Sequence, residues 1–302
     1  MNYFRSLAFI LLFVSVSVPA TFEFTDAPTN NSYYINMGRW NGLDNMSSTP
    51  LTIPIRSCFF FCLGRAEYYL RAYNFGFTHE NSAIDSELAL ARITFSQVSS
   101  GEAINLIGTY PTSGIMPVES DVSGQLTLHI LDSALDSAQP GKYRARVTLD
   151  GYNNPPFWDG REEDTRYLDV DVEVPDRVKI SGLNDVVLTS SSSNAVTSAP
   201  MNFCVFSQGG SDFQLKANST NDAGSFVLQQ GSNAINYDLL VNHPDYSSLP
   251  PNSFTSPWSG SKTQSCADEG GSNMSLSVHI PGGQNANTGV YTDTVTLTVM
   301  PM

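Results

Sequence analysis

Strict alternation of apolar and polar residues constrains the fold of this chain more than any other feature. In RYLDVDVEV (166–174), leucine or valine takes every second position. YRARVTLD (143–150), MSLSVHI (274–280) and VTLTV (295–299) show the same period. Successive side chains of a β-strand point to opposite faces, so the pattern predicts strands with one buried and one wet face. Gly, Pro, Asn and Ser separate these segments, as turns require.

Helical periodicity is nearly absent from the chain. Only Ile84–Arg92 predicts a short helix. Many short strands spaced by turn residues are typical of β-sandwiches. We therefore expect an all-β fold with two sandwich domains, since about 280 residues remain after the first 20.

The first 20 residues predict a secretory signal peptide. Arg5 precedes the apolar run Leu7–Val14, and small residues close the segment at Ala20. The run is too short to span a bilayer, and the alternative is a buried N-terminal strand. We expect residues 1–20 to be removed and a soluble, exported chain to begin at about Thr21.

Two stretches of the chain repeat one pattern. LTLHILDSALDSAQPGKYRARVTL (126–149) and LSVHIPGGQNANTGVYTDTVTL (276–297) both read strand, His-Ile, loop, Gly-x-Tyr, three residues and Val-Thr-Leu. The repeat predicts the same pair of strands in each of two domains. It also places His129 and His279 at matching outward positions, which favours surface residues over catalysts.

The two copies of the repeat differ in the residues that come after them. The first copy is succeeded by a loop and a further strand, Tyr167–Val174, whereas the second is succeeded only by Val299–Met302. We expect domains at 21–176 and 177–302, the second without its closing strand. A sandwich that lacks a strand exposes unpaired backbone groups and invites strand addition by another chain.

The open edge of the second domain is expected at Val295, Leu297 and Val299. The alternative is that the chain fills its own gap, for instance with Thr21–Asp26. That segment offers only Phe22 and Phe24 before polar residues begin.

Four cysteines in an exported chain favour two disulfides. A Cys204–Cys266 bridge would close a loop of about 60 residues and stabilise the fold by about 4 kcal/mol. Cys58 and Cys62 would lie about 13 Å apart on an extended strand. A disulfide needs less than about 7 Å between Cα atoms, so this segment turns tightly or its cysteines stay unpaired.

Charge and motifs argue against several classes of function. The formal net charge of −14 disfavours nucleic acid as a partner. The chain has no Gly-x-Ser-x-Gly, His-Glu-x-x-His or phosphate-binding glycine loop, and no repeated Cys/His spacing typical of metal sites. The carboxylates of Asp169, Asp171 and Glu173 could be imagined as a glycosidase pair, but they read as the wet face of a strand. We expect no enzyme activity, catalytic residues, metal or cofactor.

The chain resembles the two-domain tip adhesins of alternate (class 5) chaperone–usher fimbriae, which include colonisation-factor and cable-pilus tip subunits, and the resemblance is best over the second domain. The resemblance rests on VKISGLNDVVL, APMNFCVFSQGGSDFQLKA, FVLQQGSNAINYDLLV and NTGVYTDTVTLTV, together with the placement of Cys204 and Cys266. The order of these segments and cysteines along the chain also resembles that of spore-coat-U-like pilins. The first domain matches mainly by its position and its Cys pair.

The resemblance implies two immunoglobulin-like sandwiches, the C-terminal one an incomplete pilin domain. It implies a periplasmic chaperone that first lends a strand, an outer-membrane usher, and a major pilin subunit whose N-terminal extension then replaces the chaperone strand. The complete first domain would bind a host-cell glycan or protein receptor at the fimbrial tip, on the cell surface.

Receptor-binding candidates come from the resemblance and from one loop. Family members that bind glycans use basic residues near the first cysteine and near the closing hairpin, which points here to Arg56, Arg161 and Arg166. The loop DGYNNPPFWDGREEDTR (150–166) adds Trp158, and aromatics beside polar groups suit sugar or protein recognition. The alternative is that these aromatics pack onto their own domain.

Two main hypotheses remain from the sequence. The first is a fimbrial tip adhesin that performs no chemistry. The second is a non-adhesive minor or initiating pilin that caps the fibre tip and binds no receptor.

Overall fold

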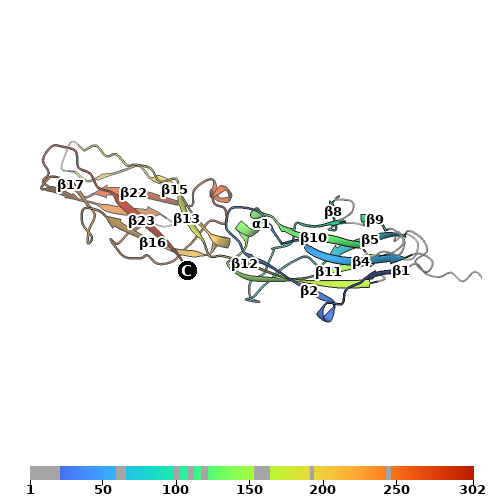
Figure 1. Ribbon diagram of the computed structural model, residues 1–302. Coiled ribbons are helices and arrows are strands. Elements are labelled where there is room, and N and C mark those ends of the chain that lie inside the picture. The colour runs from blue at the N-terminus through green and yellow to red at the C-terminus, as the bar shows by residue number, and fades with distance from the viewer. Residues whose placement is uncertain are drawn as a thin grey trace, which may run out of the picture.

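The computed structural model shows an all-β chain built around two separate hydrophobic cores, arranged end to end (Figure 1). It describes residues 21–58, 66–97, 103–107, 112–116, 122–152, 164–190, 194–242 and 246–302. The expected signal peptide lies outside these residues. The fold class predicted from the alternating pattern is confirmed.

The N-terminal part is a sandwich of two sheets. One sheet has the order β1-β4-β10-β7-β8, with β3 paired to β10. Its strands are β1 (Thr21–Phe24), β3 (Met46–Ser47), β4 (Leu51–Cys58), β7 (Arg92–Gln97), β8 (Ala103–Asn105) and β10 (Val122–Ile130). The other has the order β2-β12-β11-β5-β9, with β6 paired to β11. Its strands are β2 (Ser32–Arg39), β5 (Ala66–Tyr73), β6 (Thr78–His79), β9 (Thr112–Met116), β11 (Gly141–Tyr152) and β12 (Asp164–Val174).

The C-terminal part repeats the first of these sheets. Its order is β13-β15-β22-β19-β20, with β14 paired to β22. The strands are β13 (Val178–Ser181), β14 (Val196–Thr197), β15 (Met201–Ser207), β19 (Asp238–Asn242), β20 (Tyr246–Ser248) and β22 (Met274–Ile280). The facing sheet has the order β21-β16-β23, and β17 and β18 form a separate hairpin. These strands are β16 (Asp212–Ser219), β17 (Val227–Gln230), β18 (Asn233–Asn236), β21 (Trp258–Ser259) and β23 (Val295–Pro301).

Helical structure is short wherever the chain is described. The α-helix α1 spans Asp132–Ser137, and 3-10 turns occupy Thr29–Asn31, Gln208–Gly210 and Ala267–Glu269. None of the described helices is long and apolar enough to cross a membrane. The described residues also contain no group of three or more His, Cys, Asp or Glu placed to hold a metal ion.

The short helix predicted at Ile84–Arg92 is wrong. This segment forms a turn followed by extended chain. Leu88 and Leu90 both point into the core, and the backbone pairs with the segment around Phe77 through the Phe77 N–H and the Leu88 carbonyl (2.8 Å). Burial of residues two apart requires an extended chain, so packing overrides the local helical preference.

The predicted internal repeat is visible in the contacts. His129 Nδ1 lies 2.8 Å from Ser47 Oγ, and His279 Nδ1 lies 2.7 Å from Thr197 Oγ1. Ser47 and Thr197 are 150 positions apart in the sequence, and so are His129 and His279. Strand pairing repeats with the same spacing. Leu51 of β4 lies opposite Leu126 of β10, and Met201 of β15 lies opposite Leu276 of β22. Both histidines therefore hold short edge strands in place in equivalent domains.

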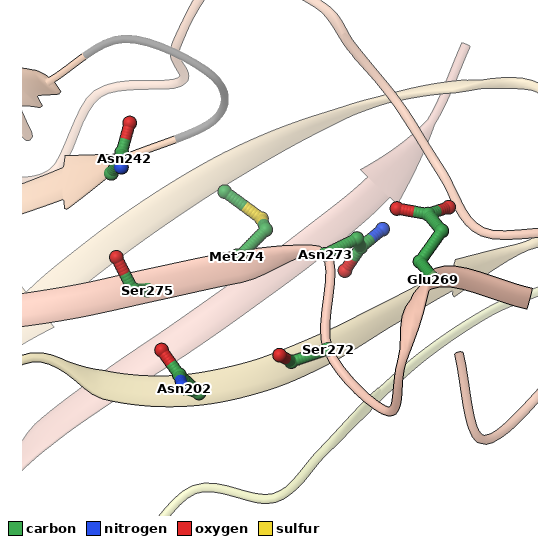
Figure 2. Close-up of a pocket in the computed structure, with 7 residues that line it drawn as sticks. All are labelled: Asn202, Asn242, Glu269, Ser272, Asn273, Met274 and Ser275. Carbon is green, nitrogen blue, oxygen red and sulfur yellow. The ribbon is translucent and has the colours of Figure 1, made fainter. Parts of the chain in front are cut away.

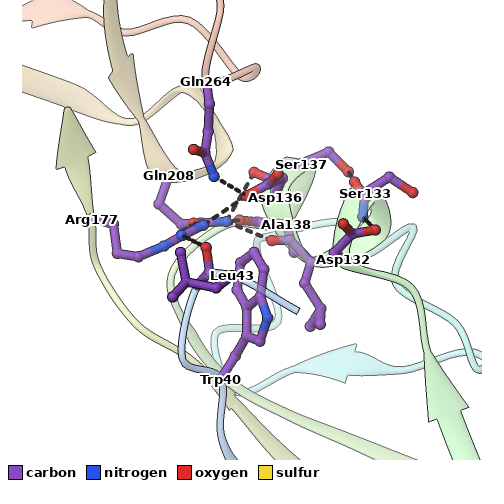
Figure 3. A network of polar contacts seen from close by, with 12 residues as sticks. Trp40, Leu43, Asp132, Ser133, Asp136, Ser137, Ala138, Arg177, Gln208 and Gln264 are labelled. Atoms are coloured by element: carbon purple, nitrogen blue, oxygen red, sulfur yellow. Dashed lines mark hydrogen bonds and ion pairs between the residues drawn. The ribbon is translucent and has the colours of Figure 1, made fainter. Parts of the chain in front are cut away.

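A buried polar joint connects the two parts (Figure 3). The Nε2 group of fully buried Gln208 donates to the carbonyls of Leu135, Asp136 and Ala138, at 2.6–2.9 Å, at the end of α1. Its Oε1 accepts from Arg177, which also contacts Asp136 Oδ1 at 2.8 Å.

The same joint is closely packed around Arg177. The guanidinium lies 4.1 Å above the Trp40 ring and donates to the Gly42 carbonyl at 2.7 Å. Gly209 has a φ of +64°, and a Cβ there would lie 2.7 Å from the Gln139 Cα. The predicted boundary at residues 176 and 177 falls between β12 and β13, immediately before this anchor.

Candidate functional site

The last described strand, β23, has a partner on one side only among the described residues. It pairs with β16 in antiparallel register from Val295 opposite Ser219 to Pro301 opposite Phe213. At the two ends of this ladder, Thr220 N–H donates to the Thr294 carbonyl and Met302 N–H donates to the Asp212 carbonyl. Antiparallel ladders alternate, so even-numbered residues of β23 bond to β16. The backbone groups of Val295, Leu297 and Val299 therefore point to the opposite side, here called the open edge.

The first domain shows what occupies the equivalent position. Leu149 lies opposite Ala72 on β11 and β5, and Leu297 lies opposite Ala217 on β23 and β16. Because β11 and β23 are copies of the repeat, β5 and β16 are equivalent neighbours. The other side of β11 is covered by antiparallel β12 over nearly its whole length. No described strand takes the place of β12 on β23.

Burial reflects this difference in strand pairing. In β11, Val147 and Leu149 are both 0% exposed. Their equivalents Val295 and Leu297 face the core of the second domain but stay half-buried, as does Val299. An apolar strip is thus left partly in contact with solvent along the open edge.

The opposite wall of this strip is β13, the first strand of the facing sheet. It lies against β23, as Figure 1 shows, and pairs only with β15 among the described strands. Its core-facing residues Val178 and Ile180 are half-buried. The corresponding residues of β1, Phe22 and Phe24, are 3% exposed. The strip therefore lies between two sheet edges that both lack one neighbour.

The segment after β13 is also unpartnered as a strand. Residues 182–189 follow β13 along the chain as β2 follows β1 in the first domain, where β2 pairs in parallel with β12. Residues 182–189 are described but form no strand. Within them, Leu183 and Val187 are 42% and 87% exposed. Without an equivalent of β12, this segment has no strand to pair with.

A carboxylate lies at the start of the same strip. Asp293 Oδ2 accepts a hydrogen bond from Tyr237 Oη at 2.6 Å, and Oδ1 accepts from Thr220 Oγ1 at 3.2 Å. Tyr237 is 5% exposed, and its burial, followed by its contacts with Asp293, raises the pKa of the phenol. Tyr237 therefore remains a neutral donor to the carboxylate.

The N-terminal strand does not fill the gap of the second domain. Thr21–Phe24 pairs with β4 in its own sandwich, so the alternative of closure by this segment is wrong. Phe24 N–H donates to Asp164 Oδ2 at 2.8 Å, and Arg166 donates to the carbonyls of Phe24 and Asp26. The strand is thus fastened within the first domain.

The receptor-binding candidates are placed differently from one another. Arg56 lies on the surface of β4 and pairs with Glu23 at 2.7 Å. Arg166 is only 6% exposed, and its guanidinium contacts Asp164 and backbone carbonyls at β1. These contacts fit a role of Arg166 in holding β1 in place. A contact between Arg166 and a receptor stays a prediction, which the burial of the side chain disfavours. Trp158 and Arg161 lie outside the described residues.

The distant cysteine pair forms a disulfide. Cys204 on β15 and Cys266 are bridged, with Cα atoms 5.8 Å apart. Cys58 ends β4, whereas Cys62 lies outside the described residues, so the prediction for this pair stays open.

A shallow polar depression lies on the outer face of the second domain (Figure 2). Asn202, Ser275 and Asn242 stand side by side across β15, β22 and β19. Glu269, Ser272, Asn273 and Met274 complete its lining. None of the predicted site residues lies there, and no sequence pattern singles it out.

Comparisons with known proteins give similarities of fold. No protein-family model and no curated protein matches the sequence. Similar solved structures include the tip adhesion subunit CsuE, in complex with its chaperone CsuC, from archaic chaperone–usher Csu pili of Acinetobacter baumannii (13% identity, 89% of this chain and 97% of that chain covered, TM-score 0.44). They also include CfaE, the adhesive subunit of CFA/I fimbria of enterotoxigenic Escherichia coli (13%, 89% and 92%, TM-score 0.38). The CupB6 tip adhesin of Pseudomonas aeruginosa is similar over 93% of both chains (11% identity, TM-score 0.32).

Proposed function

We propose that this chain is a fimbrial tip adhesin of a chaperone–usher system. Its second domain, residues 177–302, accepts a donor strand from a periplasmic chaperone and then from the next pilus subunit. Its first domain, residues 21–176, binds a host-surface receptor. The observation that carries the proposal is the open edge of β23, where the equivalent strand of the first domain is covered by β12.

The internal repeat supports a direction for the donor strand. Since β12 runs antiparallel to β11, the donor runs antiparallel to β23. Its backbone bonds to Val295, Leu297 and Val299, and its alternate apolar side chains cover the strip between β23 and β13. Residues 182–189 then pair with the donor in parallel, as β2 pairs with β12. Strand addition of this kind draws affinity from main-chain hydrogen bonds and register from alternate side chains.

The position at the fibre tip is supported by the N-terminal strand. A subunit within a fibre gives its N-terminal segment to a neighbour in the mode of assembly proposed here. In this chain Phe22 and Phe24 are buried in the first domain and Arg166 fastens their strand. These residues are therefore occupied within their own domain, which suits a subunit that only receives a strand.

The first domain supplies a test strand for the second. A copy of residues 164–174, joined after Met302 by a short linker containing Asn-Gly, would run antiparallel to β23. In the register of β12 on β11, the copies of Asp164 and Arg166 would meet the apolar strip. They are therefore replaced by Val and Leu, so that the strand copy is apolar along its whole inward row.

Three proteins then test strand acceptance. We expect the mature chain alone to aggregate or be degraded in the periplasm, and the fused chain to accumulate as a stable monomer. The matched control carries Asn in place of the copies of Leu168, Val170 and Val172, and should behave like the unfused chain. Equal yields of stable monomer from all three proteins would overturn strand acceptance.

The receptor role needs a separate test with the full fused chain. The whole chain is used because Gln208 of the second domain caps α1 of the first. We expect the fused chain to bind host cells or glycans, with binding reduced by Arg56→Ala, Trp158→Ala or Arg161→Ala. If the fused chain is folded, supports pilus assembly and binds neither cells nor a broad glycan panel, it is an initiating pilin that caps the fibre.

A further inference from the structure

One position of the open edge differs in chemistry from the first domain. Half-buried residues alternate along the final segment at 291, 293, 295, 297 and 299, so Asp293 belongs to the same inward row as Val295 and Leu297. The repeat aligns Val147 with Val295 and therefore Ala145 with Asp293. In the first domain Ala145 lies opposite Val170 of β12. The second domain thus has a carboxylate where the closed domain has an apolar pair.

The neighbours of this carboxylate are neutral. Tyr237 and Thr220 each donate one hydrogen bond to Asp293. No ion pair involves Asp293 within the described part of the chain. A carboxylate has about four acceptor sites, so about two remain for other donors.

Docking of a strand would change the surroundings of this group. At present Asp293 is half-buried, so part of the residue is still in contact with solvent. A strand on β23 would cover the inward row and remove that water. Burial of an ionised carboxylate without a further donor is costly, whereas a charge-assisted hydrogen bond offsets much of the cost.

Resting on the strand-acceptor function proposed above, we propose that Asp293 selects the donor strand by requiring a Lys or Arg at the residue that packs against it. The antiparallel register of the donor on β23 sets the position of this basic residue along the donor. Counting along the donor, alternate apolar residues cover Val299, Leu297 and Val295, and the next residue of that row is the cation. On the template of β12, it takes the position of Val170. The partner is therefore a strand of alternating apolar residues that ends in a basic side chain on its buried face.

A double-mutant cycle on the fused chain tests this inference. The strand copy carries either Val or Lys at the position of Val170, and the second domain is either unchanged or carries Asp293→Asn. The amide keeps an acceptor for Tyr237, so that contact survives the change. We expect Lys to raise the folding equilibrium constant of the second domain about tenfold more in the unchanged domain than in the Asp293→Asn variant, measured by urea unfolding.

Two further measurements guard against a variant that does not fold. With Asp293 unchanged, strand copies carrying Lys, Met or Glu at this position should close the domain in that order of stability. A Lys placed instead at the copy of outward-facing Asp171 should show no dependence on Asp293. Coupling near zero, together with equal stability of the Lys and Met copies, would overturn the inference while leaving strand acceptance intact. Failure of every copy to close the domain would overturn the proposed function itself.

Discussion

Leu149 and Leu297 occupy the same place in two copies of one fold, yet only Leu149 is fully buried. Each lies opposite an alanine of the neighbouring strand, Ala72 or Ala217. Leu149 is covered on its other side by β12 and is 0% exposed, whereas Leu297 is half-buried beside the open edge. The difference between the two leucines follows from the coverage of Leu149 by β12.

Truncation of these two leucines should therefore have different effects. Leu149→Ala should destabilise the first domain by about 2–5 kcal/mol, as for a closely packed core leucine. Leu297→Ala should cost only about 1 kcal/mol in the unfused chain, refolded in vitro at low concentration, because its side chain already contacts water. In the chain fused to a strand copy, the cost of Leu297→Ala should rise towards that of Leu149→Ala. Denaturant unfolding of each domain checks this, and equal costs for Leu297→Ala with and without the strand would contradict it.

Arg166 and Arg56 are both paired with a carboxylate in the first domain, but Arg166 is buried and Arg56 is exposed. Arg166→Ala should destabilise the domain by about 3–5 kcal/mol, because it leaves Asp164 and two carbonyls at β1 without their buried partner. Arg56→Ala breaks an exposed pair with Glu23 and should cost about 1 kcal/mol or less. Thermal and urea unfolding distinguish them. A small effect of Arg166→Ala would remove its role in fastening β1 and restore it as a receptor contact.

Gln208 should couple the stability of the two domains. Gln208→Ala removes the amide donor that three carbonyls at the end of α1 share and should cost about 2–4 kcal/mol. Hydrogen exchange at 135–138 should accelerate in the same variant. Gln125→Ala is the control, since its amide contacts Thr52 near the surface. Identical exchange at α1 in both variants would show that the joint does not stabilise the helix.

High pH should destabilise the first domain because Tyr68 is buried. The side chain is 1% exposed, and burial raises its pKa from 10.0 to about 12. The unfolded chain loses this proton at the lower pH, so the stabilising contribution is present below pH 10 and is lost between pH 10 and about 12. Tyr68→Phe should reduce the loss of stability over that pH range. Denaturant unfolding measures the stability, and tyrosinate absorbance measures the ionisation. A Tyr68 that titrates near pH 10 in the folded chain would refute this assignment.

The strands were predictable because alternation reports burial directly. RYLDVDVEV became β12 with all of its leucine and valine side chains buried, and the repeat of His-Ile and Val-Thr-Leu became matched strands in two domains. The comparison of the two copies of the repeat also predicted an open edge on the last strand, and its use as a strand acceptor stays a prediction. That comparison named Val295, Leu297 and Val299, and they lie half-buried on β23.

Other features depend on contacts that no local pattern encodes. Leu88 and Leu90 are extended because the core takes both, although their segment favours a helix. Arg166 is predicted from the sequence as a receptor contact, but its burial depends on carbonyls about 140 positions away. Gln208 gives no signal in the sequence, because its role arises only where α1 meets the second domain. Asp293 could have been found by aligning the repeat residue by residue, which shows the change from alanine to aspartate.

Residue-resolved amide hydrogen exchange of β23 tests the central claim most directly. In the mature chain without a donor, refolded in vitro at low concentration so that it stays monomeric, Thr296, Thr298 and Met300 should be protected by β16, whereas Val295, Leu297 and Val299 should exchange rapidly from the open edge. Addition of the fused strand should protect these three amides and those of residues 182–189. Slow exchange at Val295, Leu297 and Val299 in a monomeric chain without a donor would show that the second domain is already closed, and strand acceptance would be wrong.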